Sequence, residues 1–172
     1  MGRALTLSYI ASSLAVGDHM VTADWTSDDT CNYNDTSGAG TLGLTYMFIG
    51  FQQPINSDGS SIFKGGTIPV KIKLSDYNGA PVTDAQAFVF FQAGTPTVIG
   101  DTQEAVSTSA ATTGNQMRYD PIADQYIFNW DITGASIQNG TYTIWIDLGE
   151  GACGTQHTVI VSIQKTWRGI RR

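Results

Sequence analysis

Few side chains in this sequence have the chemistry of an active site. The two histidines are His19 and His157, and the two cysteines are Cys31 and Cys153. Nucleophilic catalysis needs a Ser, Cys or Thr beside a base, but no G-x-S-x-G or H-E-x-x-H motif occurs, and the glycines are scattered among turns. Neither cysteine lies in a C-x-x-C motif, and two cysteines are too few for a four-cysteine zinc site. We therefore expect structural histidines, and either one disulfide or two free thiols.

Two groups of carboxylates lie close to the cysteines. The first is Asp24, Asp28 and Asp29, and the second is Asp147 and Glu150. Glycosidases need a pair of carboxylates, but carboxylates on the end loops of a β-protein bind Ca²⁺ more readily, because this ion prefers oxygen ligands on turns. Neither group has the spacing of a calcium-binding loop. We expect solvated loop charge, with Ca²⁺ as the weaker alternative and no other cofactor.

Two tryptophans, Trp25 and Trp145, are the candidates for contact with a partner. Trp145 alternates with Ile144 and Ile146, so its indole is expected on the opposite face of a strand. An outward Trp can stack on a sugar ring or anchor a protein partner, because it offers a large apolar area with little entropy to lose. The structural alternative is that it packs beneath a neighbouring strand or domain.

The composition is that of an extracellular β-protein. Charged residues are 14% of the chain, against about 25% in typical globular proteins, and Thr, Ser, Asn, Gln and 19 Gly take their place. The net charge of −6 disfavours nucleic-acid binding. No apolar run approaches the roughly 20 residues that span a bilayer. Two glycosylation acceptor sequences begin at Asn34 and Asn139, and they matter only in a host that glycosylates.

Alternation of apolar and polar residues predicts the elements that position these side chains. It recurs along the chain and is broken by turn signals such as Asn78-Gly79, a pattern typical of a sandwich or barrel. The predicted strands are Leu44–Phe51, Thr67–Ser75, Ala85–Gln92, Gln116–Tyr119, Gln125–Asp131, Gly140–Leu148 and Thr155–Lys165. We expect Phe128 and Trp130 in the core.

The chain also contains a weak internal repeat. Residues 13–24 align with residues 136–147 at a constant offset of 123, and each copy is followed by a polar segment and a cysteine. Because the second copy lies in the penultimate predicted strand, residues 1–43 look like the last strands of a preceding sandwich without its other strands. Such strands need a cover. They can pack on their own domain, belong to an excised piece of a longer protein, or complete a neighbouring molecule.

The second part of the chain resembles a known family. The residues that carry the resemblance are Thr67 to Asp76, Asn78 to Ala85, Met117 to Pro121, Gln125 to Trp130, Gly140 to Thr143 and His157 to Val159. In this order they are similar to the PxKF-type repeat module of bacterial and archaeal surface proteins, over roughly residues 46 to 165, with Ile72 in place of the usual Phe. The resemblance implies an immunoglobulin-like sandwich used as a wall, adhesin or exoprotein module, and it implies no catalytic residues. The cysteines match no family pattern.

These observations predict an all-β, immunoglobulin-like antiparallel β-sandwich with extra N-terminal strands. The expected divisions are 1–43 as possible donor strands, 44–165 as the sandwich and 166–172 as a basic tail. A disulfide between Cys31 and Cys153 would stabilise the fold by about 4–5 kcal/mol within one chain, or would lock a polymer between chains.

Three functions fit this prediction. The first is a structural subunit or module of an extracellular assembly, such as a filament, a pilus-like fibre or a cell-wall or surface protein. It would polymerise by strand donation, with copies of itself or neighbouring surface-protein domains as partners. The alternatives are a carbohydrate- or receptor-binding adhesion module and an accessory domain of a larger secreted enzyme. The chain is not expected to be an enzyme itself, and its expected location is extracellular or the cell surface.

Overall fold

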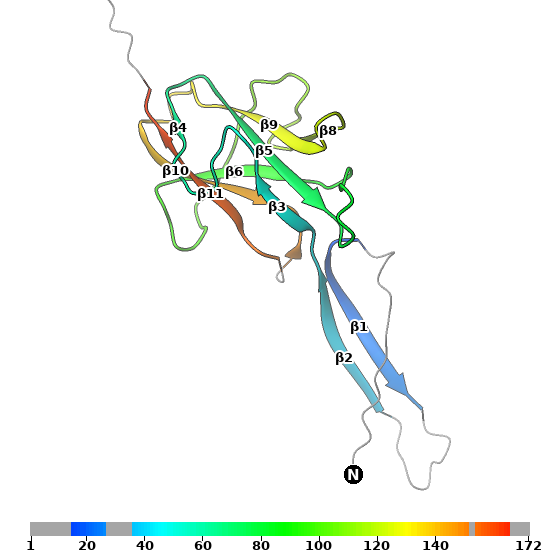
Figure 1. Ribbon diagram of the computed structural model, residues 1–172. Coiled ribbons are helices and arrows are strands. Elements are labelled where there is room, and N and C mark those ends of the chain that lie inside the picture. Colours follow the sequence, from blue (N-terminus) through cyan, green and yellow to red (C-terminus); the bar gives the residue numbers. More distant parts are fainter. Residues whose placement is uncertain (1–14, 27–35, 152–153, 166–172) are drawn as a thin grey trace, which may run out of the picture.

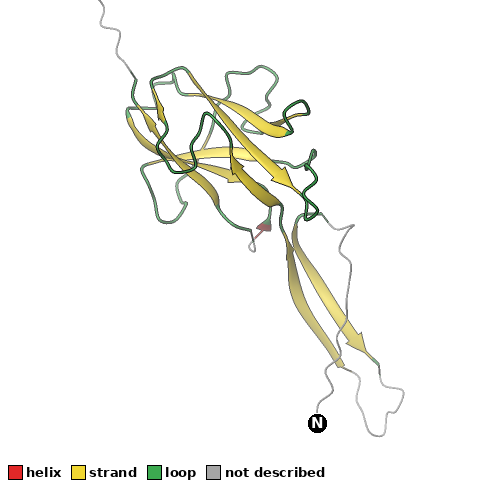
Figure 2. Ribbon diagram, in the orientation of Figure 1, coloured by secondary structure: helices red, strands yellow, loops and turns green. Residues whose placement is uncertain are grey.

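The chain folds into a β-sandwich from which a separate two-stranded sheet projects (Figure 1). This computed structural model describes residues 15–26, 36–151 and 154–165, apart from the side chain of Trp25. Strands and loops account for the architecture (Figure 2). The strands are β1 (Gly17–Trp25), β2 (Thr36–Leu44), β3 (Met47–Phe51), β4 (Ile62–Phe63), β5 (Thr67–Ser75), β6 (Phe88–Ala93), β7 (Gln103–Glu104), β8 (Arg118–Asp120), β9 (Gln125–Asp131), β10 (Gly140–Asp147) and β11 (His157–Ile163).

Two sheets form the sandwich, and their topology is immunoglobulin-like. The four-stranded sheet has the order β3-β5-β9-β8, and the five-stranded sheet has the order β4-β11-β10-β6-β7. Strand pairs are antiparallel except β4 with β11, which is parallel. The sandwich therefore begins in the four-stranded sheet with β3, and the chain then crosses to the five-stranded sheet as β4. This order matches the two sheets of an immunoglobulin fold, and it confirms the predicted all-β class.

The predicted strands agree with the observed ones where alternation is strong. Thr67–Ser75 and Gln125–Asp131 are β5 and β9 with the predicted bounds. Leu44, predicted to open a sandwich strand, is instead the last residue of β2, and β3 begins at Met47. The short strands β4 and β7 were not predicted individually, because two residues carry no periodicity.

Inward-facing side chains of both sheets build one core. On β5 the alternate residues Ile68, Val70 and Ile72 have no exposed surface. Phe128 and Trp130 of β9 are 1% exposed, which confirms their predicted core position. The Trp130 ring lies 4.8 Å from that of Phe91 and 6.1 Å from that of Tyr142, so aromatic contacts join the two sheets. The core is thus made by β3 to β11 and the segments between them.

Tyr142 forms a tyrosine corner at the start of β10. Its hydroxyl accepts a hydrogen bond from the Gln138 amide at 2.8 Å and donates one to the Gln138 carbonyl at 3.1 Å. A tyrosine near the start of the penultimate strand, bonded to backbone a few residues earlier, is a hallmark of immunoglobulin-like sandwiches. The corner fixes the connection from β9 to β10.

Tyr126 ties the segment before β6 to the four-stranded sheet. Its hydroxyl accepts a hydrogen bond from the Ala85 amide at 2.8 Å and donates one to the Val82 carbonyl at 3.1 Å. Burial raises the pKa of Tyr126 from 10.0 to about 12. The neutral phenol is therefore part of the folded structure.

Tyr142→Phe should lower the free energy of unfolding by about 1 kcal/mol, because both hydrogen bonds of the corner are lost while the ring stays buried. Denaturant unfolding measures this. The matched control is Tyr77→Phe, since Tyr77 is 85% exposed. Equal stability of the two variants would contradict a structural role for the corner.

Stability should fall between about pH 10 and pH 12 as Tyr126 titrates. Its folded-state pKa is raised above the unfolded value, so its contribution is complete below pH 10.0 and is lost as pH rises through about 12. Absorbance titration of the seven tyrosines should show a late component near pH 12 that Tyr126→Phe removes. Ionisation of every tyrosine near pH 10 in the folded protein would refute this.

Candidate functional site

Neither strand of the β1–β2 hairpin contributes a residue to the described core of the sandwich. The hairpin strands pair over nine residues each, from Gly17 opposite Leu44 at the sandwich to Trp25 opposite Thr36 at the far end. In the described part of the chain, β1 and β2 form a sheet of their own. A lone two-stranded hairpin is at best marginally stable in water, so this element needs a cover.

The register divides the hairpin into two unlike faces. One face carries Asp18, Met20, Thr22, Asp24, Ser37, Ala39, Thr41 and Gly43. The other, here named the uncharged face, carries His19, Val21, Ala23, Gly38, Gly40, Leu42 and Leu44. Val21 is 45% exposed although it lies in the middle of a strand. The uncharged face is the side on which burial is least costly, because no carboxylate has to be desolvated there.

A shallow groove runs over the uncharged face. It has a volume of about 520 Å³, and its described lining residues are Val21, Ala23 and the stretch from Gly38 to Leu42. A Cβ added to Gly38 or Gly40 would meet no atom within 4 Å, and neither glycine adopts the left-handed conformation. The backbone therefore does not require glycine at these positions. Glycine inside a strand without such a need indicates close approach by another element.

The uncharged face has the same register as the core face of β10 and β11. β1 begins at Gly17 and β10 at Gly140, again an offset of 123. Gly17 pairs with Leu44, and Gly140 pairs with Ile163. The matching residues of β2 and β11 are therefore Leu44 and Ile163, Leu42 and Val161, Gly40 and Val159, and Gly38 and His157. All four of these β11 residues are buried in the sandwich.

Glu150 joins the hairpin to the sandwich. Its Oε1 accepts a hydrogen bond from the Tyr46 amide at 2.9 Å, and Tyr46 lies between β2 and β3. Its Oε2 lies 3.0 Å from His157 Nε2, and the His157 ring stacks on Phe48 at 4.1 Å. Burial, with Asp84 and Glu150 nearby, raises the pKa of Tyr46. The prediction of solvated loop charge is wrong for Glu150, which is 5% exposed, because a histidine and a backbone amide satisfy its carboxylate.

The base of β1 also contacts the turn after β10. A Cβ on Gly151 would lie 2.7 Å from Asp18 Oδ2, so a side chain at residue 151 would require the Asp18 carboxylate to move. Asp147, of the second predicted carboxylate group, accepts a hydrogen bond from the Gly149 amide at 2.9 Å. The second carboxylate group therefore stabilises a turn and a junction. Asp24 is exposed on the hairpin, and Asp28 and Asp29 lie outside the described residues.

The two predicted partner-contact tryptophans have different outcomes. Trp145 lies on the outer face of the five-stranded sheet, opposite Ile144 and Ile146, as alternation predicts. It is half-buried, because its ring packs 5.2 Å from that of Phe90 on the adjacent strand β6. Trp25 ends β1, and its side chain lies outside the described part.

Several other candidates fall on parts that the structure does not describe. These are Cys31, Cys153, Asn34 and the basic tail 166–172. Asn139 is described and exposed, and its Oδ1 accepts a hydrogen bond from the Lys165 amide at 2.6 Å. Within the described ranges, no three His, Cys, Asp or Glu side chains gather as metal ligands. Over the same ranges, no helix has the length and apolar character to cross a membrane.

Comparison with known proteins gives only distant structural similarity. No family model and no curated protein matches the chain. One similar structure is that of domains 4 and 5 of the S-layer protein SbsC, with 15% identity, a TM-score of 0.38, and coverage of 88% of this chain and 60% of that one. Another is a chimeric titin Z1Z2 carrying a KLER peptide from decorin, with 11% identity, a TM-score of 0.32, and coverage of 87% and 62%. The chain thus spans less than two thirds of either structure, and its fold assignment rests on strand topology.

Glu150→Ala should lower the free energy of unfolding by about 3 kcal/mol, since it leaves the Tyr46 amide and the buried His157 without their partner. It should also speed amide exchange at Tyr46. Denaturant unfolding and hydrogen exchange measure the two effects. Glu104→Ala, at an exposed glutamate of β7, is the matched control. A junction role is refuted if both variants lose the same stability.

Proposed function

We propose that this chain is a structural module of an extracellular or cell-surface assembly, and that its β1–β2 hairpin is donated to a neighbouring β-sandwich. The observation that carries the proposal is the uncharged face of the hairpin. It has the register of a core face, yet it is uncovered by the sandwich of its own chain.

The sandwich has a complete core without the hairpin. Its described buried apolar residues run from Phe51 to Ile163, and none comes from β1 or β2. The apolar area of Val21 and Leu42 is therefore available for another contact. Ordering two nine-residue strands costs conformational entropy that a lone ribbon cannot offset by burial. A neighbour that covers this face supplies the missing stabilisation.

The positions of the hairpin and the last strand favour an extended, head-to-tail arrangement. The hairpin leaves the sandwich at the end where β3 begins, whereas β11 runs to the opposite end (Figure 1). Contacts made by different surfaces at different places on a molecule give open chains rather than closed rings, unless the rotation happens to close. Such chains are the geometry of a fibre or a wall layer.

The junction prepares the hairpin for donation. Glu150, which pairs with His157, accepts a hydrogen bond from the amide of Tyr46, two residues after the end of β2. A junction that restricts the direction of the hairpin before contact reduces the entropy lost on assembly. The weakly charged composition and the resemblance to PxKF-type surface modules support an extracellular setting. Copies of the chain and neighbouring surface-protein domains are the proposed partners.

The adhesion alternative would use the aromatic pair Trp145 and Phe90. Sugar stacking needs an open aromatic face, and these two rings cover part of each other at 5.2 Å. The pair is therefore less suited to a single sugar than to a broad protein contact. This comparison favours the assembly function.

Deletion of residues 1–44 should give a soluble monomer, whereas the full chain should grow in mass as its concentration rises. Light scattering and negative-stain microscopy measure this. Because the deletion also removes Cys31, full-length Cys31→Ser and reductant serve as controls for disulfide-linked growth. Equal growth with and without the hairpin would sink the proposal, as would a full chain that stays monomeric at every concentration.

A further inference from the structure

The edges of the sandwich offer little room for a donated strand. β4 and β7 have two residues each, β8 has three, and β3 has five with a register shift between Phe48 and Gly50. A nine-residue strand of the hairpin would leave most of its backbone groups unpaired at any of these edges. The hairpin therefore needs a sheet face to pack against.

The covering face must supply bulky side chains. Where β11 places His157 and Val159 toward its core, β2 has Gly38 and Gly40 in the same register. The resulting groove of about 520 Å³ would stay partly empty against small side chains, and such voids forfeit packing contacts. Aromatic rings are the side chains that best fill space over strand glycines.

The covering face should also carry few charges, because each charge would lose water on contact. The outer face of the four-stranded sheet carries Lys71, Lys73 and Arg118, and Asp120 and Asp131 lie on the same face. Packing the uncharged face there would take five charged side chains out of water, which is costly. The four-stranded sheet is therefore the less favourable surface.

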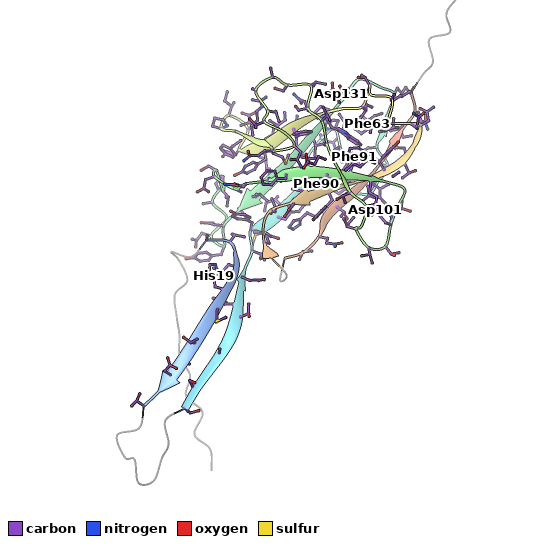
Figure 3. The ribbon with its side chains drawn as sticks, turned by 180° about the vertical axis from the view of Figure 1, so that it is seen from behind. His19, Phe63, Phe90, Phe91, Asp101 and Asp131 are labelled. Carbon is purple, nitrogen blue, oxygen red and sulfur yellow. The ribbon has the colours of Figure 1, made fainter. Side chains whose placement is uncertain are left out.

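The outer face of the five-stranded sheet meets the first two conditions and carries fewer charges. Trp145 and Phe90 stand side by side on adjacent strands, with Thr158 and the 38%-exposed Ile160 beside them on β11. Two carboxylates share this face, namely Asp147 at the end of β10 and Glu104, which lies opposite Phe90 on the edge strand β7. Figure 3 labels Phe90 on this sheet and His19 at the base of the hairpin.

We infer that the uncharged face of the hairpin docks on the outer face of the five-stranded sheet of a second copy of this chain, with Trp145 and Phe90 entering the groove over Gly38 and Gly40. This rests on the proposed function and names its partner surface. The groove and the aromatic pair lie on different parts of the molecule, so each copy can use its groove in one contact and its aromatic pair in another. Repetition of such a contact extends a chain.

The first variant fills the groove in the full-length chain. Gly40→Val has room for its side chain and needs no unusual backbone, and valine favours strands, so the hairpin should fold at least as well. Thr22→Val is the matched control, because Thr22 lies on the opposite face of the hairpin and is not among the residues that line the groove. Gly40→Val should abolish concentration-dependent growth in sedimentation velocity, and Thr22→Val should leave it unchanged.

The second variant removes the tryptophan of the aromatic pair. Trp145→Thr keeps a strand-forming residue on the outer face and should weaken association about thirtyfold, the effect of losing a central aromatic contact. Tyr77→Thr, at an exposed tyrosine elsewhere, is the control. Near-ultraviolet circular dichroism checks that each variant keeps the native sandwich.

Mixing the two defective variants gives the decisive measurement. The Trp145→Thr chain keeps an intact groove, and the Gly40→Val chain keeps an intact aromatic pair. The mixture should therefore form dimers, which grow no further because each remaining surface is defective. If each variant fails alone and the mixture also stays monomeric, these surfaces are not partners and the inference is overturned. If deletion of residues 1–44 stops assembly but both point variants assemble like the parent, the inference fails while hairpin donation stands.

Discussion

The long strands of the sandwich carry an apolar side whose exposure to water is unfavourable, and the arrangement of the molecule follows from how those sides are covered. In the sandwich, β5 and β9 cover β10 and β11, and Trp130, Phe91 and Tyr142 join the layers. The hairpin has the same kind of side in the same register, but the sandwich of its own chain does not cover that side. The molecule therefore has one covered core and one apolar face that the sandwich leaves uncovered. The uncovered face is the physical basis of the proposed assembly function.

The connection between these two parts is built from few groups. One carboxylate, Glu150, bonds both to the backbone that leaves the hairpin and to His157 at the start of β11. Because the contact joins residues 104 positions apart, hairpin orientation depends on correct closure of the sandwich.

The sequence pattern predicted those parts of the fold whose information is local. Alternation delimited β5 and β9. The tyrosine corner was not predicted, although a tyrosine near the start of the penultimate predicted strand was a usable signal for it. Glu150 could not be distinguished from a solvated loop carboxylate, since its partners are a distant histidine and a backbone amide that has no sequence signature. Gly38 and Gly40 fell within the predicted donor strands 1–43, but the face that they occupy could not be assigned without their pairing partners. The candidate site was identified from the pairing register of β1 and β2 and not from the composition of the chain.

The path of the chain through the sandwich has a mechanical consequence. Tension applied at the hairpin passes along β2 into β3 and on to β4, while tension at the other end enters through β11. The two paths meet where β4 and β11 run parallel, held by hydrogen bonds from Ser162 to Ser61 at 2.9 Å and from Gln164 to Phe63 at 2.7 Å. These hydrogen bonds lie across the direction of the applied force and are loaded together in shear, so they do not break one after another. A two-residue strand that adds little to the core is in this way the element that sets how much force the fold bears in a stretched array.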